Sequence, residues 1–117
     1  MKKPIKKILV IGGTGYIGTP LVKKLNNEDY NLTLLIKDEK DFRDEFNGCR
    51  YFVADLLNKK SLEKNINDFD LVINLAAIIR TLDKKKYQVN IDGTKNLTEV
   101  LGKKGIKMTL HASKIRP

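Results

Sequence analysis

Four glycines fall within seven residues, in the segment GGTGYIG at residues 12–18, directly after the apolar run 8–11. Glycine weakens helices and strands, so a cluster of this density indicates a backbone requirement. The spacing satisfies G-x-G-x-x-G counted from Gly13 and, equally, G-x-x-G-x-x-G counted from Gly12. Between a strand and a helix, such a loop turns tightly, admits a pyrophosphate against its backbone and presents helix N–H groups to it. The cluster therefore predicts a strand–loop–helix unit that binds phosphates.

Short apolar runs alternate with amphipathic stretches along the rest of the chain. Runs that are apolar throughout predict strands buried on both faces, and their alternation with helices predicts a parallel sheet. We therefore expect an α/β fold, a three-layer Rossmann-like doubly wound parallel sheet of five strands in the order 3-2-1-4-5. Asn58 is expected to cap one helix, and Gly102 or Gly105 to end another. The predicted strands are 8–11, 32–36, 51–54, 71–76 and a weaker 108–112, and the amphipathic stretches are 16–27, 39–46, 59–67 and 87–103.

The charge balance is basic, with 23 lysine and arginine residues against 14 acidic ones and a net charge of +9. A polyanionic partner is one explanation. However, the lysines are dispersed in pairs and one triplet, 84–86, and the four arginines stand apart. Specific readers of nucleic acid use clustered arginine and aromatic side chains. We interpret the surplus as a lysine-rich solvated surface and keep nucleic-acid binding as the minority alternative.

Several classes of protein are disfavoured by simple counts. One cysteine, Cys49, excludes an internal disulfide framework, and together with the single histidine, His111, it gives no basis for a metal site. The longest apolar runs are far shorter than the roughly 20 residues that a bilayer crossing needs, and no signal-peptide cleavage site follows the basic start. These features predict a cytoplasmic protein with no membrane partner.

The end of the second apolar run bears on the choice of cofactor. In dinucleotide-binding folds, an acidic residue about 20 positions past the last glycine binds the ribose 2′-hydroxyl, whereas a basic group suits a 2′-phosphate. Here the run ends in Ile36-Lys37-Asp38. Asp38 favours NAD by its distance, and Lys37 favours NADP, although either could be a solvated loop charge. We expect NAD(P) as the cofactor, with a slight preference for NADP.

These motifs resemble the nucleotide-binding half of an extended or atypical short-chain dehydrogenase/reductase of the NAD-dependent epimerase/dehydratase group. The segment ILVIGGTGYIG (8–18) is similar to the family's first strand and glycine loop. The segment VNIDGTKNLTEVL (89–101), with Asn90, Gly93, Thr94 and Asn96, is similar to its central helix. The resemblance covers nearly the whole chain. It implies that residues 1–117 form one NAD(P)-binding domain, apparently truncated after the fifth strand.

The resemblance also implies which residues contact the cofactor. Lys37 falls where many members carry a cofactor-discriminating arginine, and Asp55, followed by Leu56, matches an aspartate that meets the adenine ring. Ala76 and Ala77 match a short segment that lies against the cofactor. From the residues alone, Asp55 could equally cap the following turn, and the alanines could serve close packing. The implied cofactor-binding residues are Gly12, Gly13, Thr14, Gly15, Tyr16, Ile17, Gly18, Lys37, Asp38, Asp55, Leu56, Ala76 and Ala77.

The resemblance does not extend to a catalytic pair. The family's acid/base chemistry uses a tyrosine whose pKa is lowered by a lysine four residues later, on the same helical face. None of the four tyrosines of this sequence is followed by lysine at that distance. Ser113 is the only catalytic candidate, and a weak one, because Ala112 and Lys114 beside it depart from the family pattern. The printed sequence is therefore not expected to complete the family's oxidation–reduction cycle.

Three hypotheses about function remain after these observations. The first is the cofactor half of a nucleotide-sugar epimerase/dehydratase-type enzyme, binding NAD(P) without completing the chemistry. The second is a stand-alone dinucleotide-binding sensor or regulatory module. The third is a basic interaction protein on a retained Rossmann fold. We also expect self-association as a dimer, which would bury either the region of the fifth strand, otherwise an exposed sheet edge, or the helix at 87–103.

Overall fold

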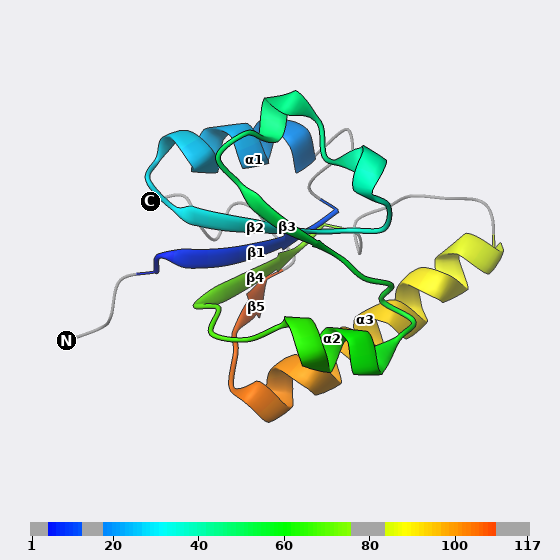
Figure 1. Ribbon diagram of the computed structural model, residues 1–117. Coiled ribbons are helices and arrows are strands. Elements are labelled where there is room, and N and C mark those ends of the chain that lie inside the picture. Colours follow the sequence, from blue (N-terminus) through cyan, green and yellow to red (C-terminus); the bar gives the residue numbers. More distant parts are fainter. Residues whose placement is uncertain (1–4, 13–17, 76–83, 110–117) are drawn as a thin grey trace.

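The structure is a computed structural model that describes residues 5–12, 18–75 and 84–109 (Figure 1). It consists of a parallel sheet with helices on both of its faces. The elements, in chain order, are β1 (Lys7–Ile11), α1 (Gly18–Asn27), β2 (Asn31–Ile36), the 3₁₀ turns η1 (Glu39–Asp41) and η2 (Asp44–Phe46), β3 (Arg50–Val53), α2 (Lys59–Asn65), β4 (Leu71–Asn74), α3 (Lys84–Lys104) and β5 (Met108–Thr109).

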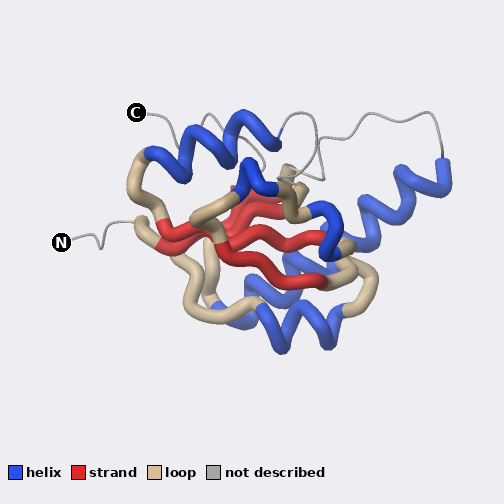
Figure 2. Tube along the Cα trace, turned by 45° about the horizontal axis from the view of Figure 1, so that its top comes forward, coloured by secondary structure: helices blue, strands red, loops and turns tan. Residues whose placement is uncertain are grey.

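The strands lie in the order β3-β2-β1-β4-β5, and every neighbouring pair is parallel. Helix α1 covers one face of the sheet, whereas α2 and α3 cover the other, which gives three layers (Figures 1 and 2). The Rossmann-like α/β class and the order 3-2-1-4 of the first four strands are thereby confirmed. The fifth strand is only two residues long as described, since the predicted residues 110–112 lie outside the described part of the chain.

The side chains of the central strands enter two apolar clusters, one on each face of the sheet. On β1, Ile8 and Val10 join the cluster beneath α1, whereas Leu9 and Ile11 join the cluster beneath α2 and α3. All four are buried. This explains why β1 is apolar at every position from Ile8 to Ile11 and not at alternate ones, because a strand covered on both faces has no solvent side. Each such side chain contributes about 1.5–3 kcal/mol through burial.

The stretch 39–46 does not form a continuous helix, which corrects the expectation drawn from its spacing. It forms the two short turns η1 and η2, separated at Phe42, whose backbone is extended (φ −84°, ψ 101°). Phe42 stacks on Tyr51 with ring centroids 4.4 Å apart, and Phe46 is completely buried. Eight residues are too few to form a stable helix by themselves, so these tertiary contacts determine the conformation.

The predicted helix ends are confirmed at two points. Asn58 caps α2, since its Oδ1 accepts a hydrogen bond from the Ser61 N–H at 3.1 Å. Gly105 ends α3 with a positive φ of 67°, and the N–H of Ile106 donates to the Leu101 carbonyl at 3.0 Å. Glycine favours this left-handed position because it lacks a Cβ. Within the described ranges, we find no helix with the length and apolar character that a membrane crossing requires.

Candidate functional site

The carboxyl ends of β1 and β4 meet at the point where the order of strand connections reverses. From β1 the chain continues to β2 on one side, while β4 and β5 lie on the other. The last residue of β1, Ile11, pairs with Leu35 of β2 and with Asn74 of β4, so the three strands end at the same level. In open α/β sheets, ligands bind in the crevice at such a switch point. This edge is therefore the candidate functional site.

The two ends of the glycine loop, Gly12 and Gly18, are described, the first directly after β1 and the second at the start of α1. Gly12 follows β1 directly and has a φ of 80°, which is a conformation that favours glycine. Gly18 is the buried first residue of α1. The backbone requirement expected for the cluster is thus seen at Gly12. The five residues between them, Gly13, Thr14, Gly15, Tyr16 and Ile17, fall outside the residues that the structure describes.

Asn74 is a polar residue at this edge that was not among the predicted site residues. It is the last residue of β4 and is completely buried, yet neither its amide nitrogen nor its amide oxygen has a hydrogen-bond partner among the described residues. An unsatisfied buried polar group costs about 1–3 kcal/mol, so such groups call for an explanation. The signal in the sequence was an asparagine within the otherwise apolar run 71–76. Ala76 and Ala77, which follow it, are not in the described ranges.

Lys37 and Asp38 follow β2 at the same edge, and both are exposed. Asp38 is engaged locally, because its Oδ1 accepts a hydrogen bond from the Lys40 N–H at 3.1 Å and caps η1. Its Oδ2 lies 3.8 Å from the Lys40 ammonium nitrogen. Both carboxylate oxygens of Asp38 therefore have a partner on the same short turn.

Asp55 follows the end of β3 and begins the loop 55–57, which leads towards α2. Its Oδ1 accepts a hydrogen bond from the Leu57 N–H at 2.9 Å, and its carbonyl accepts one from the Asn58 N–H at 2.9 Å. The capping role that the sequence left open is therefore present. The side chain remains exposed, and its Oδ2 has no partner within the described ranges. Asp55 is thus fixed through one oxygen and open through the other.

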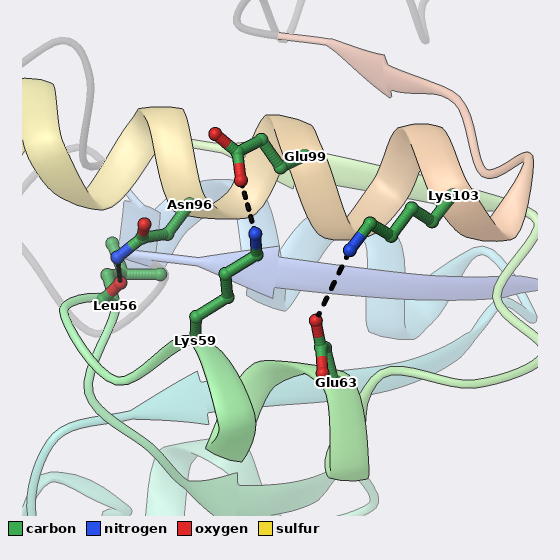
Figure 3. A network of polar contacts seen from close by, with 6 residues as sticks. All are labelled: Leu56, Lys59, Glu63, Asn96, Glu99 and Lys103. Carbon is green, nitrogen blue, oxygen red and sulfur yellow. Dashed lines mark hydrogen bonds and ion pairs between the residues drawn. The ribbon is translucent and has the colours of Figure 1, made fainter.

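The next residue, Leu56, is held by α3. Its carbonyl accepts a hydrogen bond from Nδ2 of Asn96 at 2.9 Å (Figure 3). Two ion pairs lie beside this contact and join α2 to α3, Lys59 with Glu99 and Lys103 with Glu63. The hydrogen bond between the first pair lowers the pKa of the Glu99 carboxyl and raises that of the Lys59 ammonium. The elements after β3 are therefore connected to α3 by directional contacts.

The structure offers no separate reactive centre among the described residues. Burial raises the pKa of the Cys49 thiol, which disfavours the nucleophilic thiolate at neutral pH. Within the described ranges, no three histidine, cysteine or acidic side chains group as metal ligands. The catalytic candidate Ser113, like His111, falls in the part of the chain that is not described. The site therefore consists of the sheet edge and the loops along it.

A family model matches residues 8–113, which cover all the described strands and helices except Lys7 at the start of β1, and it is that of the NAD dependent epimerase/dehydratase family. This chain belongs to that family. The resemblance inferred from the glycine loop, the Asp-Leu pair and the central helix is thereby confirmed. The family's dependence on NAD agrees with a cofactor site at the sheet edge.

Individual relatives match the chain over only part of their own length. A sterol-4-alpha-carboxylate 3-dehydrogenase (decarboxylating) of Candida albicans is 27% identical over 97% of this chain and 35% of its own. A UDP-N-acetyl-alpha-D-glucosaminuronate decarboxylase of Bacillus cytotoxicus is 30% identical over 92% of this chain and 36% of its own. The structure of a UDP-Glc/GlcNAc 4-epimerase from Campylobacter jejuni has the same fold, with a TM-score of 0.75 at 24% identity over 86% of this chain and 35% of that one. The chain spans about a third of the length of the curated relatives it matches.

Proposed function

We propose that this chain binds NAD(P) across the carboxyl ends of β1 and β4, as the cofactor half of a nucleotide-sugar epimerase/dehydratase-type enzyme. The observation that carries the proposal is the buried, unpartnered amide of Asn74 at the switch point. Across the sheet it pairs in register with Ile11, the residue before Gly12. A polar ligand at this edge would supply partners that the described residues do not.

The residues along the edge suit different parts of a dinucleotide. The loop 12–18, followed by the first turn of α1, would hold the pyrophosphate, because free N–H groups and the helix dipole favour negative charge there. The open oxygen of Asp55 would accept from the adenine amine. The nicotinamide ring, when bound, supplies hydride transfer. For this chain's own residues we propose binding and orientation, since the printed sequence has no Tyr-x-x-x-Lys pair.

We propose a preference for NADP over NAD from the contacts after β2. Both carboxylate oxygens of Asp38 face Lys40, which leaves this side chain less free to accept from ribose hydroxyls. The neighbouring Lys37 is exposed and carries the charge that a 2′-phosphate would need. A Lys37→Ala variant is therefore expected to bind NADP about tenfold more weakly and NAD unchanged, because a charge-assisted contact to phosphate is lost.

The experiment is calorimetric titration of the chain with NAD, NADH, NADP and NADPH. A Gly15→Val variant, which would block the phosphate loop with a side chain, is compared with Gly102→Ala, a change on the exposed side of α3 that meets no atom within 4 Å. We expect binding that Gly15→Val abolishes and Gly102→Ala preserves. No binding of any of the four dinucleotides at millimolar concentration would refute the proposal.

We also propose that the chain self-associates through the β5 edge of the sheet. Within the described residues, β5 pairs only with β4, and no described strand lies on its other side. Sedimentation at micromolar concentration should give a dimer, and a monomer would contradict this proposal without affecting cofactor binding.

A further inference from the structure

We propose that α3 positions the adenine-binding side of the site from a distance, through Asn96 and Gly93, which together fix the loop 55–57. This inference rests on the proposed NAD(P) function, because Asp55 matters to affinity only if the chain binds a dinucleotide. Asn96 and Gly93 are positioning residues here, and neither is proposed to touch the cofactor.

The first contact is the hydrogen bond from Nδ2 of Asn96 to the carbonyl of Leu56, at 2.9 Å. Leu56 lies between Asp55 and Leu57, the two residues joined by the side-chain-to-backbone bond at 2.9 Å that shapes this turn. Asn96 therefore holds the middle of the turn, while Asp55 at its start stays exposed. The contact joins residues 40 positions apart, so it fixes the loop to the helix and not only to its own neighbours.

The second contact is steric. A Cβ placed on Gly93 would lie 2.8 Å from the Cβ of Leu56 and 3.3 Å from its Cδ1. The Cβ of Leu56 is bonded directly to the backbone and cannot rotate away, so any side chain at position 93 would displace the loop. Glycine is otherwise a poor residue inside a helix. Its place on α3, three residues before Asn96 and on the same helical face, is explained by this close approach.

The loop is also held at its far end. Asn58, which follows the loop, caps α2, and Lys59 at the start of α2 pairs with Glu99 of α3 (Figure 3). The segment from Leu56 to Lys59 is thus joined to α3 at both ends. Binding groups must be held within roughly 0.5 Å of their productive position to be effective. Through these contacts, α3 sets where Asp55 lies relative to an adenine ring.

The first test compares two alanine substitutions on the same helix. Gly93→Ala should weaken the binding of NAD and of ADP about tenfold or more, because the loop that carries Asp55 is displaced. Gly102→Ala, which meets no atom within 4 Å, should leave both affinities unchanged. Circular dichroism checks that both variants remain folded. Amide chemical shifts of residues 55–57 report displacement of the loop even without ligand, and unchanged shifts in Gly93→Ala would overturn the inference.

The second test uses pH to separate positioning from a general loss of stability. In Asn96→Asp the introduced carboxyl can donate to the Leu56 carbonyl only while it is protonated, and once ionised it repels that oxygen. Relative to the unsubstituted chain at the same pH, ADP affinity should be about tenfold lower near pH 8 and should recover only as the pH falls through the carboxyl pKa, which is about 3.9 for an ordinary aspartate. Asn96→Ala should show the loss without the recovery.

The outcomes separate this inference from the function on which it rests. If the unsubstituted chain binds neither NAD nor ADP, the proposed function fails and the inference falls with it. If that chain binds both, and folded Gly93→Ala and Asn96→Ala bind ADP as tightly, the inference alone is wrong. A constant affinity ratio for Asn96→Asp across the pH range would also overturn it.

Discussion

The two packed faces of the sheet differ from the edge where its strands end in how their side chains and backbone are satisfied. On the faces, β1 contributes buried apolar side chains to both clusters, and the helices above them complete a close-packed interior. At the edge, Gly12 has a positive φ, and neither the buried amide of Asn74 nor one carboxylate oxygen of Asp55 has a hydrogen-bond partner in the part of the chain that the structure describes. Sites that bind ligands commonly depart in this way from the local rules of stability. The faces therefore account for stability, and the edge is where we propose that the cofactor binds.

The largest effect on the free energy of unfolding is expected from truncating a side chain that is buried on one of the packed faces. Phe46→Ala should lower the free energy of unfolding by about 3–5 kcal/mol, because it leaves a cavity in the cluster beneath α1, where the ring is completely buried. Leu97→Ala, on the buried side of α3, should lower the free energy of unfolding by about 2–5 kcal/mol for the same reason. Urea denaturation measures both changes. A loss below about 1 kcal/mol in either variant would mean that the corresponding face does not carry the stability assigned to it.

A substitution at the carboxyl edge should raise the free energy of unfolding. Asn74→Leu removes a buried, unpartnered amide in favour of an apolar side chain of similar size, so it should raise the free energy of unfolding by about 1–3 kcal/mol. The same change should abolish or strongly weaken NAD(P) binding. Denaturation and calorimetry on the same preparation test both parts. A less stable Asn74→Leu variant that still binds cofactor would reverse the distinction between edge and faces.

The two glycines of α3 allow a matched pair of substitutions, because Gly93 faces the loop 55–57 and Gly102 faces solvent. Gly93→Ala should destabilise the fold by about 1–3 kcal/mol, since the added methyl group has no room beside Leu56. Gly102→Ala should stabilise it by up to about 1 kcal/mol, the ordinary gain of alanine over glycine within a helix. Thermal unfolding of the two variants measures both effects, and equal shifts in the unfolding midpoint would contradict the close approach of Gly93 to Leu56.

The smallest effect is expected from the exposed pair of Lys59 and Glu99. Pairing lowers the pKa of Glu99, so its contribution is present above the ordinary carboxyl pKa and is lost as the pH falls through the lowered value. Pairing raises the pKa of Lys59, so the contribution is also lost in strong alkali, as the pH rises through the raised value. Melting curves of the chain and of Glu99→Gln should differ most near neutral pH and converge in acid. Added salt should reduce the difference between the two melting temperatures, and a difference that salt does not change would exclude the ion pair as its cause.

Much of the fold follows from local patterns in the sequence. The alternation of strands and helices and the cap at Asn58 were predicted because each depends on residues within a few positions of one another, and Gly105 is one of the two glycines expected to end α3. The order of the first four strands was predicted from the topology that is typical of such alternation, although it pairs residues as far apart as Ile8 and Leu71. The stretch 39–46 was the exception. Its periodicity is that of a helix, but the contacts of its two phenylalanines with Tyr51 and with the core impose two short turns.

In the candidate site, too, some features could be predicted from the sequence and others could not. The family and the residues that follow each strand could be predicted from the sequence, since these features lie in short motifs, and the phosphate-binding role of the glycine loop stays a prediction. The tertiary structure was needed to show that Asn74 is buried without a hydrogen-bond partner among the described residues, and that α3 holds the loop after β3 through Asn96. The physical reason is distance along the chain. Hydrogen bonds and close contacts between residues some 40 positions apart depend on how the layers pack, and no local pattern records that packing.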